Sequence, residues 1–276
     1  MDMYQHRRLR LLSERYADKI PTWDVINEFL SRPVNHYPLD YPIHYFKLAE
    51  KLFPQCHLIA NEDTERTWDD FNNNSSRFYL YLQYLIANGA RMDGIGMQYH
   101  LFSKKEVMES RVDKTLNTEN LLRVLEYYSL LGRAIHVSEI TLSTFNDGDR
   151  GEEIQAQMAE NLYKIWFSGE KVASIVYWNL VDGHAYSMPQ FGWDENYFGG
   201  GLFRNDMTSK PAYTVIDNLI NKEWHTDELG ESDALGHFAF TGYYGSYRVV
   251  IEKGGCSSEQ IIELGKGTPF AKVVLQ

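Results

Sequence analysis

The sequence alternates short apolar runs with longer segments of helical period, and this alternation constrains the fold more than any other feature. The segments between the runs place apolar residues on one helical face, as Leu9, Leu12 and Tyr16 do. Strands separated by helices of this length pair in parallel, so the sequence predicts a parallel sheet with crossover helices. The strands are expected in five runs: TWDVINEF (22–29), HLIAN (57–61), GIGMQYH (94–100), AIHVSEI (134–140) and VASIVYWN (172–179).

Polar residues end or directly follow each of the five runs. In a (β/α)8 barrel the carboxyl ends of all strands open into one mouth, which is where such barrels carry their chemistry. We therefore expect a partial (β/α)8 TIM-type barrel of about five β/α units, three fewer than a closed barrel has. The polar residues at the five ends are Asn27 and Glu28, Asn61 and Glu62, Gln98 and His100, Glu139, and Asn179 with Asp182.

The pattern changes after Lys222, which divides the chain into residues 1–222 and residues 223–276. The second part begins with a polar linker, HTDELGESDALG, and continues with runs of period two that glycines separate. This predicts a small antiparallel, β-sandwich-like domain of about 50 residues. Support of the barrel and attachment to a glycan both stay open as its role. The four runs carry Phe238 and Phe240, then Tyr247, Val249 and Ile251, then Ile261 and Ile262, then Val273 and Leu275.

Charge and composition narrow the class of partner. The net charge of −11 leaves no concentrated basic surface for phosphates, so we predict no nucleic-acid partner. The aromatic fraction of 14% suits stacking on sugar faces, although such rings also build cores. The opening residues, MDMYQHRRLRLLSERY, lack the apolar stretch of a signal peptide or membrane anchor, so no membrane partner is predicted. Cys56 and Cys256 lack metal-ligand spacing, and neither a metal nor a cofactor is predicted.

Glu28 and Glu139 form the best candidate catalytic pair. Both end strands that would line one barrel mouth, and two carboxylates on either side of a sugar ring are the groups that hydrolyse glycosides. Either glutamate alone is equally explained as a solvated carboxylate at a strand end. Their paired placement beside Asn27 and His100 favours the catalytic interpretation.

Three motifs together resemble a known family. WDVINE, GIGMQYH and HVSEI occur in the order and setting found in the glycoside hydrolase family 10 endo-β-1,4-xylanases, and VYWNLVDGHAY is similar to the last-strand segment of that family. The resemblance covers roughly residues 5–222. It implies a TIM barrel that hydrolyses xylan or xylo-oligosaccharides. A non-catalytic carbohydrate-binding remnant, and the same fold acting on another β-glycan, are the alternatives.

The resemblance also implies roles for the catalytic pair and its neighbour. Glu28 would be the general acid/base and Glu139 the nucleophile of a retaining double displacement. Asn27 would bind the 2-hydroxyl of the reacting sugar. The assignment requires one carboxyl to be protonated while its neighbour is charged.

Further substrate-binding positions follow from the same resemblance. His100 would donate a hydrogen bond to the nucleophile, with Gln98 nearby, and Trp178 would form an apolar floor under the sugar. Without the motifs, His100 is explained as a strand-end histidine and Trp178 as core. Tyr186 and Asn61 complete the predicted set of substrate-binding residues. The aromatic, Gly-rich loop 187–206 is either a wall of the cleft or a packed surface loop.

The sequence departs from the family pattern at several places. Thr141 stands where many members have an aspartate that orients the histidine, and Tyr186 stands where a second tryptophan is usual. The tetrapeptide NEDT, which begins at Asn61, replaces the usual Asn-Asp/Glu-Tyr-Asn.

Segments that resemble the first three strands of the family do not occur in this chain. We therefore expect two unpaired sheet edges, and either a missing N-terminal segment or a complementing chain as partner. For the parent protein we expect an extracellular or periplasmic location.

Overall fold

The computed structural model describes residues 2–31, 38, 40–109, 115–265, 267 and 271–273. The chain forms two compact units, Met1–Val215 and Ile216–Gln276. The predicted boundary after Lys222 stays a prediction.

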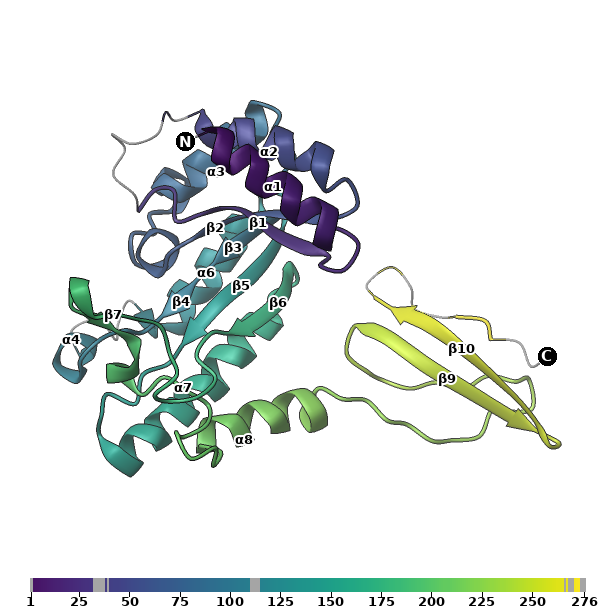
Figure 1. The fold of residues 1–276 in the computed structure, drawn as a ribbon. Helices are drawn as coiled ribbons and strands as arrows, with labels where there is room; N and C mark the ends of the chain where they lie inside the picture. Colours follow the sequence, from purple (N-terminus) through teal and green to yellow (C-terminus); the bar gives the residue numbers. More distant parts are fainter. Residues whose placement is uncertain are drawn as a thin grey trace. The chain divides into compact units, whose positions relative to one another are not determined.

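A parallel sheet is the centre of the first unit (Figure 1). Its strands pair in the order β1, β2, β3, β5, with β4 and β6 also paired to β5, and every pairing is parallel. This confirms the predicted partial barrel. The predicted strand 94–100 is divided at Gln98 into two short strands. The strands are β1 (Thr22–Asn27), β2 (His57–Glu62), β3 (Gly94–Met97), β4 (Tyr99–His100), β5 (Ala134–Thr141) and β6 (Val172–Tyr177).

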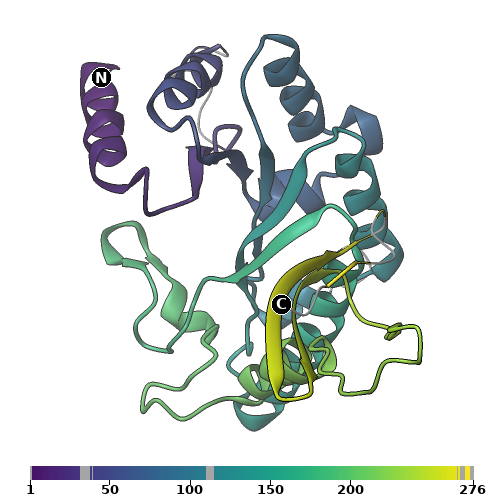
Figure 2. The same cartoon turned by 90° about the vertical axis from the view of Figure 1, so that its right-hand side faces the viewer.

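Helices cover one side of this sheet because each has one apolar face. Helix α2 contacts β1 and β2, α6 contacts β5, and α7 contacts β6. In Figure 2 the blue and teal helices lie along one side of the strands, and the green segment that follows β6 lies on the other. The α-helices among the described residues are α1 (Asp2–Tyr16), α2 (Tyr41–Leu52), α3 (Arg77–Ala87), α4 (Lys105–Glu109), α6 (Thr118–Ser129), α7 (Gly148–Ser168) and α8 (Pro211–Asn218).

The ends of helix α6 follow from local chemistry. The side chain of Asn117 accepts a hydrogen bond from the backbone N–H of Asn120 at 2.9 Å and caps the first turn. Gly132, at φ 67°, supplies the left-handed residue that follows the helix.

Strands β1 and β6 are the edges of the described sheet, as expected from five strand positions instead of eight. Leu58 on β2 and Ile95 on β3 are fully buried, whereas Val176 on the edge strand β6 is 48% exposed. The core therefore lies under the central strands.

Short elements fill the connections, and the sequence did not reveal most of them. Two π-helical turns, η2 (Glu65–Asp69) and η6 (Leu219–Glu223), continue from helical residues. The loop after β6 holds a hairpin whose two strands have two residues each, and two 3₁₀ turns. The remaining elements are η3 (Asn73–Ser75), β7 (Ser187–Met188), η4 (Pro189–Phe191), β8 (Trp193–Asp194) and η5 (Glu195–Phe198).

One antiparallel hairpin dominates the second unit. It consists of β9 (Gly245–Lys253) and β10 (Cys256–Leu264), paired from Lys253 with Cys256 to Gly245 with Leu264. Gly254 and Gly255, at φ 58° and 84°, form its turn, which requires two left-handed residues.

The predicted strand at Phe238 and Phe240 is wrong, and the one at Val273 and Leu275 lies partly outside the described residues. Phe238 and Phe240 lie in an irregular segment, and the ring of Phe240 packs on Tyr247 at 5.2 Å between centroids. Val273 is not in a strand, and Leu275 lies outside the described residues. Alternation marks an apolar face, but a strand also needs a hydrogen-bonded partner, which β9 and β10 supply to each other.

Candidate active site

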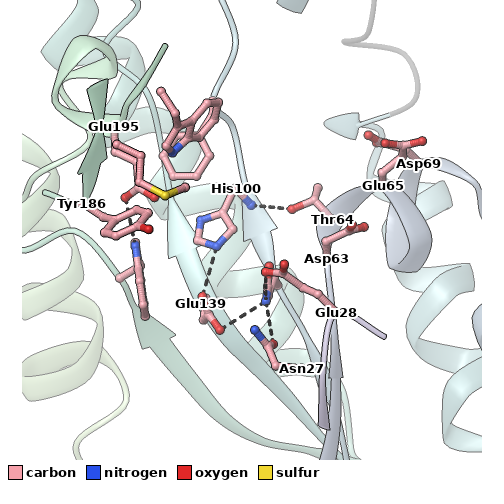
Figure 3. A pocket seen from close by; sticks show the side chains of 15 residues that line it. Asn27, Glu28, Asp63, Thr64, Glu65, Asp69, His100, Glu139, Tyr186 and Glu195 are labelled. Atoms are coloured by element: carbon pink, nitrogen blue, oxygen red, sulfur yellow. Dashed lines mark hydrogen bonds and ion pairs between the residues drawn. The ribbon is translucent and has the colours of Figure 1, made fainter. Parts of the chain in front are cut away.

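A cleft of about 1040 Å³ lies at the carboxyl ends of the parallel strands (Figure 3). It receives residues from β1, from the loop after β2, from the β3–β4 junction, from β5 and from the segment after β6. Seven of the eight predicted site residues line it. The lining residues are Asn27, Glu28, Asp63, Thr64, Glu65, Asp69, Gln98, His100, Phe102, Glu139, Trp178, Tyr186, Met188, Trp193 and Glu195.

Glu28 enters the cleft on a left-handed backbone. Its φ is 54°, a conformation that costs a non-glycine residue free energy and that clusters at functional sites. The backbone N–H of Glu28 donates to the carbonyl of Asn61 at 2.9 Å, which holds the turn against the end of β2. The side chain therefore leaves the line of β1 at a fixed position.

The amide of Gln98 joins the two candidate catalytic carboxylates. Its Nε2 donates to Oε1 of Glu28 at 3.1 Å and to Oε1 of Glu139 at 3.2 Å. Both Oε1 atoms lie within 3.2 Å of one nitrogen, so they are at most twice that distance, about 6.4 Å, apart. The interruption between β3 and β4 at Gln98 directs this side chain into the mouth of the barrel.

Three donors converge on the carboxylate of Glu139. Oε1 accepts from Asn61 Nδ2 at 3.0 Å and from Gln98 Nε2. Oε2 lies 3.4 Å from His100 Nε2 (Figure 3). An anionic carboxylate accepts on both oxygens, so this arrangement suits the charged form. Its side chain is 16% exposed and still faces the cleft.

Asn61 lies beneath the cleft and does not line it. It is 1% exposed, and its Nδ2 donates to Asn27 Oδ1 at 2.9 Å as well as to Glu139. Its Oδ1 accepts from Ser138 Oγ at 2.6 Å. Gly96 makes room for it, since a Cβ there would lie 2.4 Å from Asn61 Oδ1. This geometry places Asn61 behind the candidate catalytic residues, and its predicted contact with substrate has no support from the described residues.

Asp24 is a carboxyl that sequence reasoning did not select. The residue is exposed on the edge strand β1, while its carboxyl group lies among protein atoms that partly remove it from water. It lies two residues before Ile26 on β1, and its Oδ2 is 3.4 Å from Asn61 Nδ2. Burial, followed by the charge of Glu139, raises the pKa of Asp24 to about 6. The sequence does contain a signal for Asp24. It is a carboxylate in the middle of an apolar run, and the alternation of side chains along the strand places it on the same face as Ile26.

Asn27 offers a donor to the cleft, whereas both ring nitrogens of His100 contact protein groups. Asn27 Oδ1 accepts from Asn61 and from Gln98, so the amide nitrogen is the atom that it can offer to a sugar hydroxyl. His100 Nδ1 lies 3.0 Å from Thr141 Oγ1, and its ring stacks on Phe102 with centroids 4.8 Å apart. A hydroxyl therefore takes the place of a charged orienting group for this histidine.

Aromatic residues form the wall on the β6 side. Trp178 is 48% exposed, its backbone N–H donates to Ile140 O at 2.8 Å, and its indole meets the His100 ring edge-on at 6.2 Å. Tyr186 is 51% exposed and faces the same cleft. The loop after β6 adds Met188, Trp193 and Glu195, so of its two predicted roles the structure favours the cleft wall over a packed surface loop.

The loop after β2 contributes the other residues that the sequence did not single out. Asp63, Thr64, Glu65 and Asp69 line the cleft from the NEDT segment and from η2. Glu62, the last residue of β2, is 1% exposed, and burial raises the pKa of its carboxyl. Glu62 accepts hydrogen bonds from the residues that follow β1 and does not line the cleft.

Within the part of the chain that the structure describes, no group of three or more His, Cys, Asp and Glu side chains is placed to hold a metal ion. Over the same residues, no helix has the length and apolar character needed to cross a membrane.

A parallel β/α sheet that carries two glutamates in one cleft at its strand ends is the arrangement of a barrel glycosidase. The sequence matches the family described as glycosyl hydrolase family 10 over residues 3–219, and the chain belongs to that family.

Three similar proteins put this membership in context. The chain is 26% identical over 275 residues to the anti-sigma-I factor RsgI6 of Acetivibrio thermocellus, covering 95% of this chain and 31% of that protein. It is 28% identical over 203 residues to endo-1,4-beta-xylanase A of Caldicellulosiruptor saccharolyticus, covering 64% and 54%. The crystal structure of xylanase 10B from Thermotoga petrophila RKU-1 in complex with xylobiose shows the same fold at a TM-score of 0.61 and 22% identity, covering 79% and 65%. The chain thus spans between about a third and two thirds of the length of these proteins.

Proposed function

We propose that this protein hydrolyses β-1,4-xylosidic bonds inside xylan chains with retention of configuration. The observation that carries the proposal is the shared donor Gln98, which keeps the nearest oxygens of Glu28 and Glu139 at most about 6.4 Å apart. Retaining glycosidases hold the two carboxyls about 5–5.5 Å apart, and inverting enzymes need about 6.5–9.5 Å to admit a water. The spacing supports a double displacement.

Relatives support the substrate class. One is named an endo-1,4-beta-xylanase, and a structural neighbour contains xylobiose. Since the chain covers 54% of that relative, the activity of the whole protein is part of the proposal. Xylan is a polymer met outside the cytoplasm, so an extracellular or periplasmic location belongs to the proposal as well.

In this proposal each residue has a role in one or both of the two steps. Glu139 attacks the anomeric carbon while Glu28, protonated, donates its proton to the leaving oxygen. A water then loses a proton to Glu28, attacks the same carbon and releases Glu139. Asn27 donates to the 2-hydroxyl of the sugar, and His100 holds Oε2 of Glu139 during both steps.

The test uses xylohexaose and the full chain. Following the anomers by NMR should show the β-anomer of the new reducing end first, and an initial α-anomer would refute the double displacement. Glu139→Gln should lower kcat by about 10³-fold or more, because the nucleophile acts directly at the reacting carbon. Glu153→Gln, an exposed glutamate on α7, serves as the matched control and should leave the rate unchanged.

A second candidate is saccharide binding without turnover. Thr141 beside His100 supplies no charge, the described sheet is open at β1 and β6, and a relative that covers 95% of the chain is named an anti-sigma factor. Binding of xylohexaose by calorimetry with no release of reducing ends would favour this candidate. A higher initial rate on β-glucan than on xylan would instead point to another β-glycan as substrate.

The open edges bear on the predicted partner. Strands β1 and β6 each present one side to no other described strand, and parallel edges of this kind are pairing sites. These edges agree with the predicted partner, a further segment or a separate chain that completes the barrel, which stays a prediction.

A further inference from the structure

Glu195 is a buried carboxylate in the wall of the cleft. It begins the short turn η5, is 6% exposed, and yet lines the cleft together with Trp178. Figure 3 shows it near Tyr186. Among the described residues no Lys, Arg or His forms an ion pair with it. Removing a carboxylate from water is costly without compensation, so its hydrogen bonds indicate what it does.

Two hydrogen bonds of Glu195 join two separate parts of the wall. Its Oε2 accepts from the indole Nε1 of Trp178 at 3.0 Å. Its backbone N–H donates to the carbonyl of Tyr186 at 3.1 Å. One residue therefore connects the end of β6 to the loop that carries the next aromatic residue.

Trp178 needs such a contact because its ring is half exposed. The backbone hydrogen bond to Ile140 fixes the position of the Trp178 backbone. The two side-chain torsions of Trp178 must be fixed by other contacts. The edge-on contact with His100, at 6.2 Å between centroids, is a weak restraint. A hydrogen bond to a charged acceptor is stronger and has a defined direction.

We propose that Glu195 is a positioning residue, which holds the Trp178 indole in the orientation that stacks on a sugar and thereby sets the affinity of the cleft for saccharides. The link to saccharides rests on the proposed function. The orientation of the indole is independent of it and can be tested without ligand.

The plainer explanation is that Glu195 only stabilises the loop. Two substitutions separate the explanations: Glu195→Gln keeps a side-chain oxygen as acceptor, and Glu195→Leu removes it. Trp178→Phe removes the donor and keeps an aromatic ring. Glu195→Leu in the Trp178→Phe background completes a double-mutant cycle, which isolates the contact between the two side chains.

The first readout is the indole N–H signal of Trp178 in a ¹⁵N-labelled full chain, assigned by its disappearance in Trp178→Phe. We expect Glu195→Leu to move this signal toward that of a water-exposed indole, and Glu195→Gln to move it much less. An unchanged signal in Glu195→Leu would overturn the proposal, whether or not the chain binds xylan fragments.

The second readout is the dissociation constant for xylotriose. Glu195→Leu should weaken binding by about tenfold, the size expected from loss of one charge-assisted bond, and Glu195→Gln should restore most of it. In the Trp178→Phe background the same substitution should change binding less than twofold. Equal losses in both backgrounds would assign Glu195 to the loop alone. No binding by the wild-type chain would refute the proposed function. The indole signal would then still test whether Glu195 positions Trp178.

Discussion

The stability of the barrel unit should fall in mild acid because of a histidine pair at the amino end of the sheet. Nε2 of His136 on β5 lies 3.0 Å from Nε2 of His57 on β2, and Nδ1 of His136 lies 2.8 Å from Ser174 Oγ. A Cβ at Gly94 would approach both rings within 2.9 Å, so the pair has no space to separate. Burial, followed by the neighbouring His57, lowers the pKa of His136 from 6.5 to about 4.

The sign and size of the effect follow from proton binding. The unfolded chain binds a proton on this imidazole below about pH 6.5, whereas the folded chain resists it until about pH 4, so the free energy of unfolding falls as the pH decreases between these values. The full difference corresponds to about 3 kcal/mol, and we expect about 1–2 kcal/mol because water at the edge of the pair screens part of it.

Urea unfolding at pH 7.5 and pH 4.5 measures this prediction, with His136→Gln as the comparison. Glutamine keeps a hydrogen-bonding side chain and cannot be protonated. The pH-dependent loss of stability should be smaller in the variant by about 1–2 kcal/mol, whatever the carboxylates contribute, since these titrate in both proteins. Identical pH dependence in the two proteins would refute the reasoning.

Three further predictions concern the site. The pKa of Asp24 is raised to about 6, so its contribution to stability is present at low pH and is lost as the pH rises through 6. Asp24→Asn should therefore stabilise the chain more at pH 8 than at pH 5. We expect a difference of at most about 1 kcal/mol in urea unfolding, because the residue is exposed on β1 and solvent screens much of the effect. Gly96→Ala should lower both the melting temperature and the initial rate on xylohexaose, because the new methyl group meets Asn61 Oδ1 at 2.4 Å; an unchanged rate would remove Asn61 from the positioning network. Thr141→Val should lower kcat about tenfold with little change in KM, since His100 loses the partner of Nδ1; a change confined to KM would contradict this.

The fold, and the placement of Glu28 and Glu139 in one cleft, could be predicted from the sequence because both depend on local patterns. Each strand of the sheet is a short apolar run, and the side chains at its carboxyl end point to a common mouth in any parallel β/α sheet. The positions of Glu28, Glu139 and His100 in one cleft followed from that rule and from the motifs around them. The aromatic content of the loop 187–206 left a cleft wall and a packed surface loop as equal alternatives, and the structure decides between them.

Contacts between distant segments were not readable. Asn61 was expected at the substrate, yet it lies under the cleft because Gly96, on the neighbouring strand, leaves space for its side chain. Glu195 gave no signal in a loop of polar and aromatic residues, since its role depends on where the Trp178 indole lies. The alternation around Phe238 predicted a strand that has no partner among the described residues.

Covalent trapping of the nucleophile tests the central claim most directly. The full chain is incubated with an activated 2-deoxy-2-fluoro β-xylobioside, a substrate type that slows the second step of a double displacement more than the first. The account predicts a stoichiometric mass increase located on the peptide that contains Glu139, and no increase in Glu139→Gln. Turnover of xylohexaose with the adduct on another carboxylate, or with none formed, would contradict it.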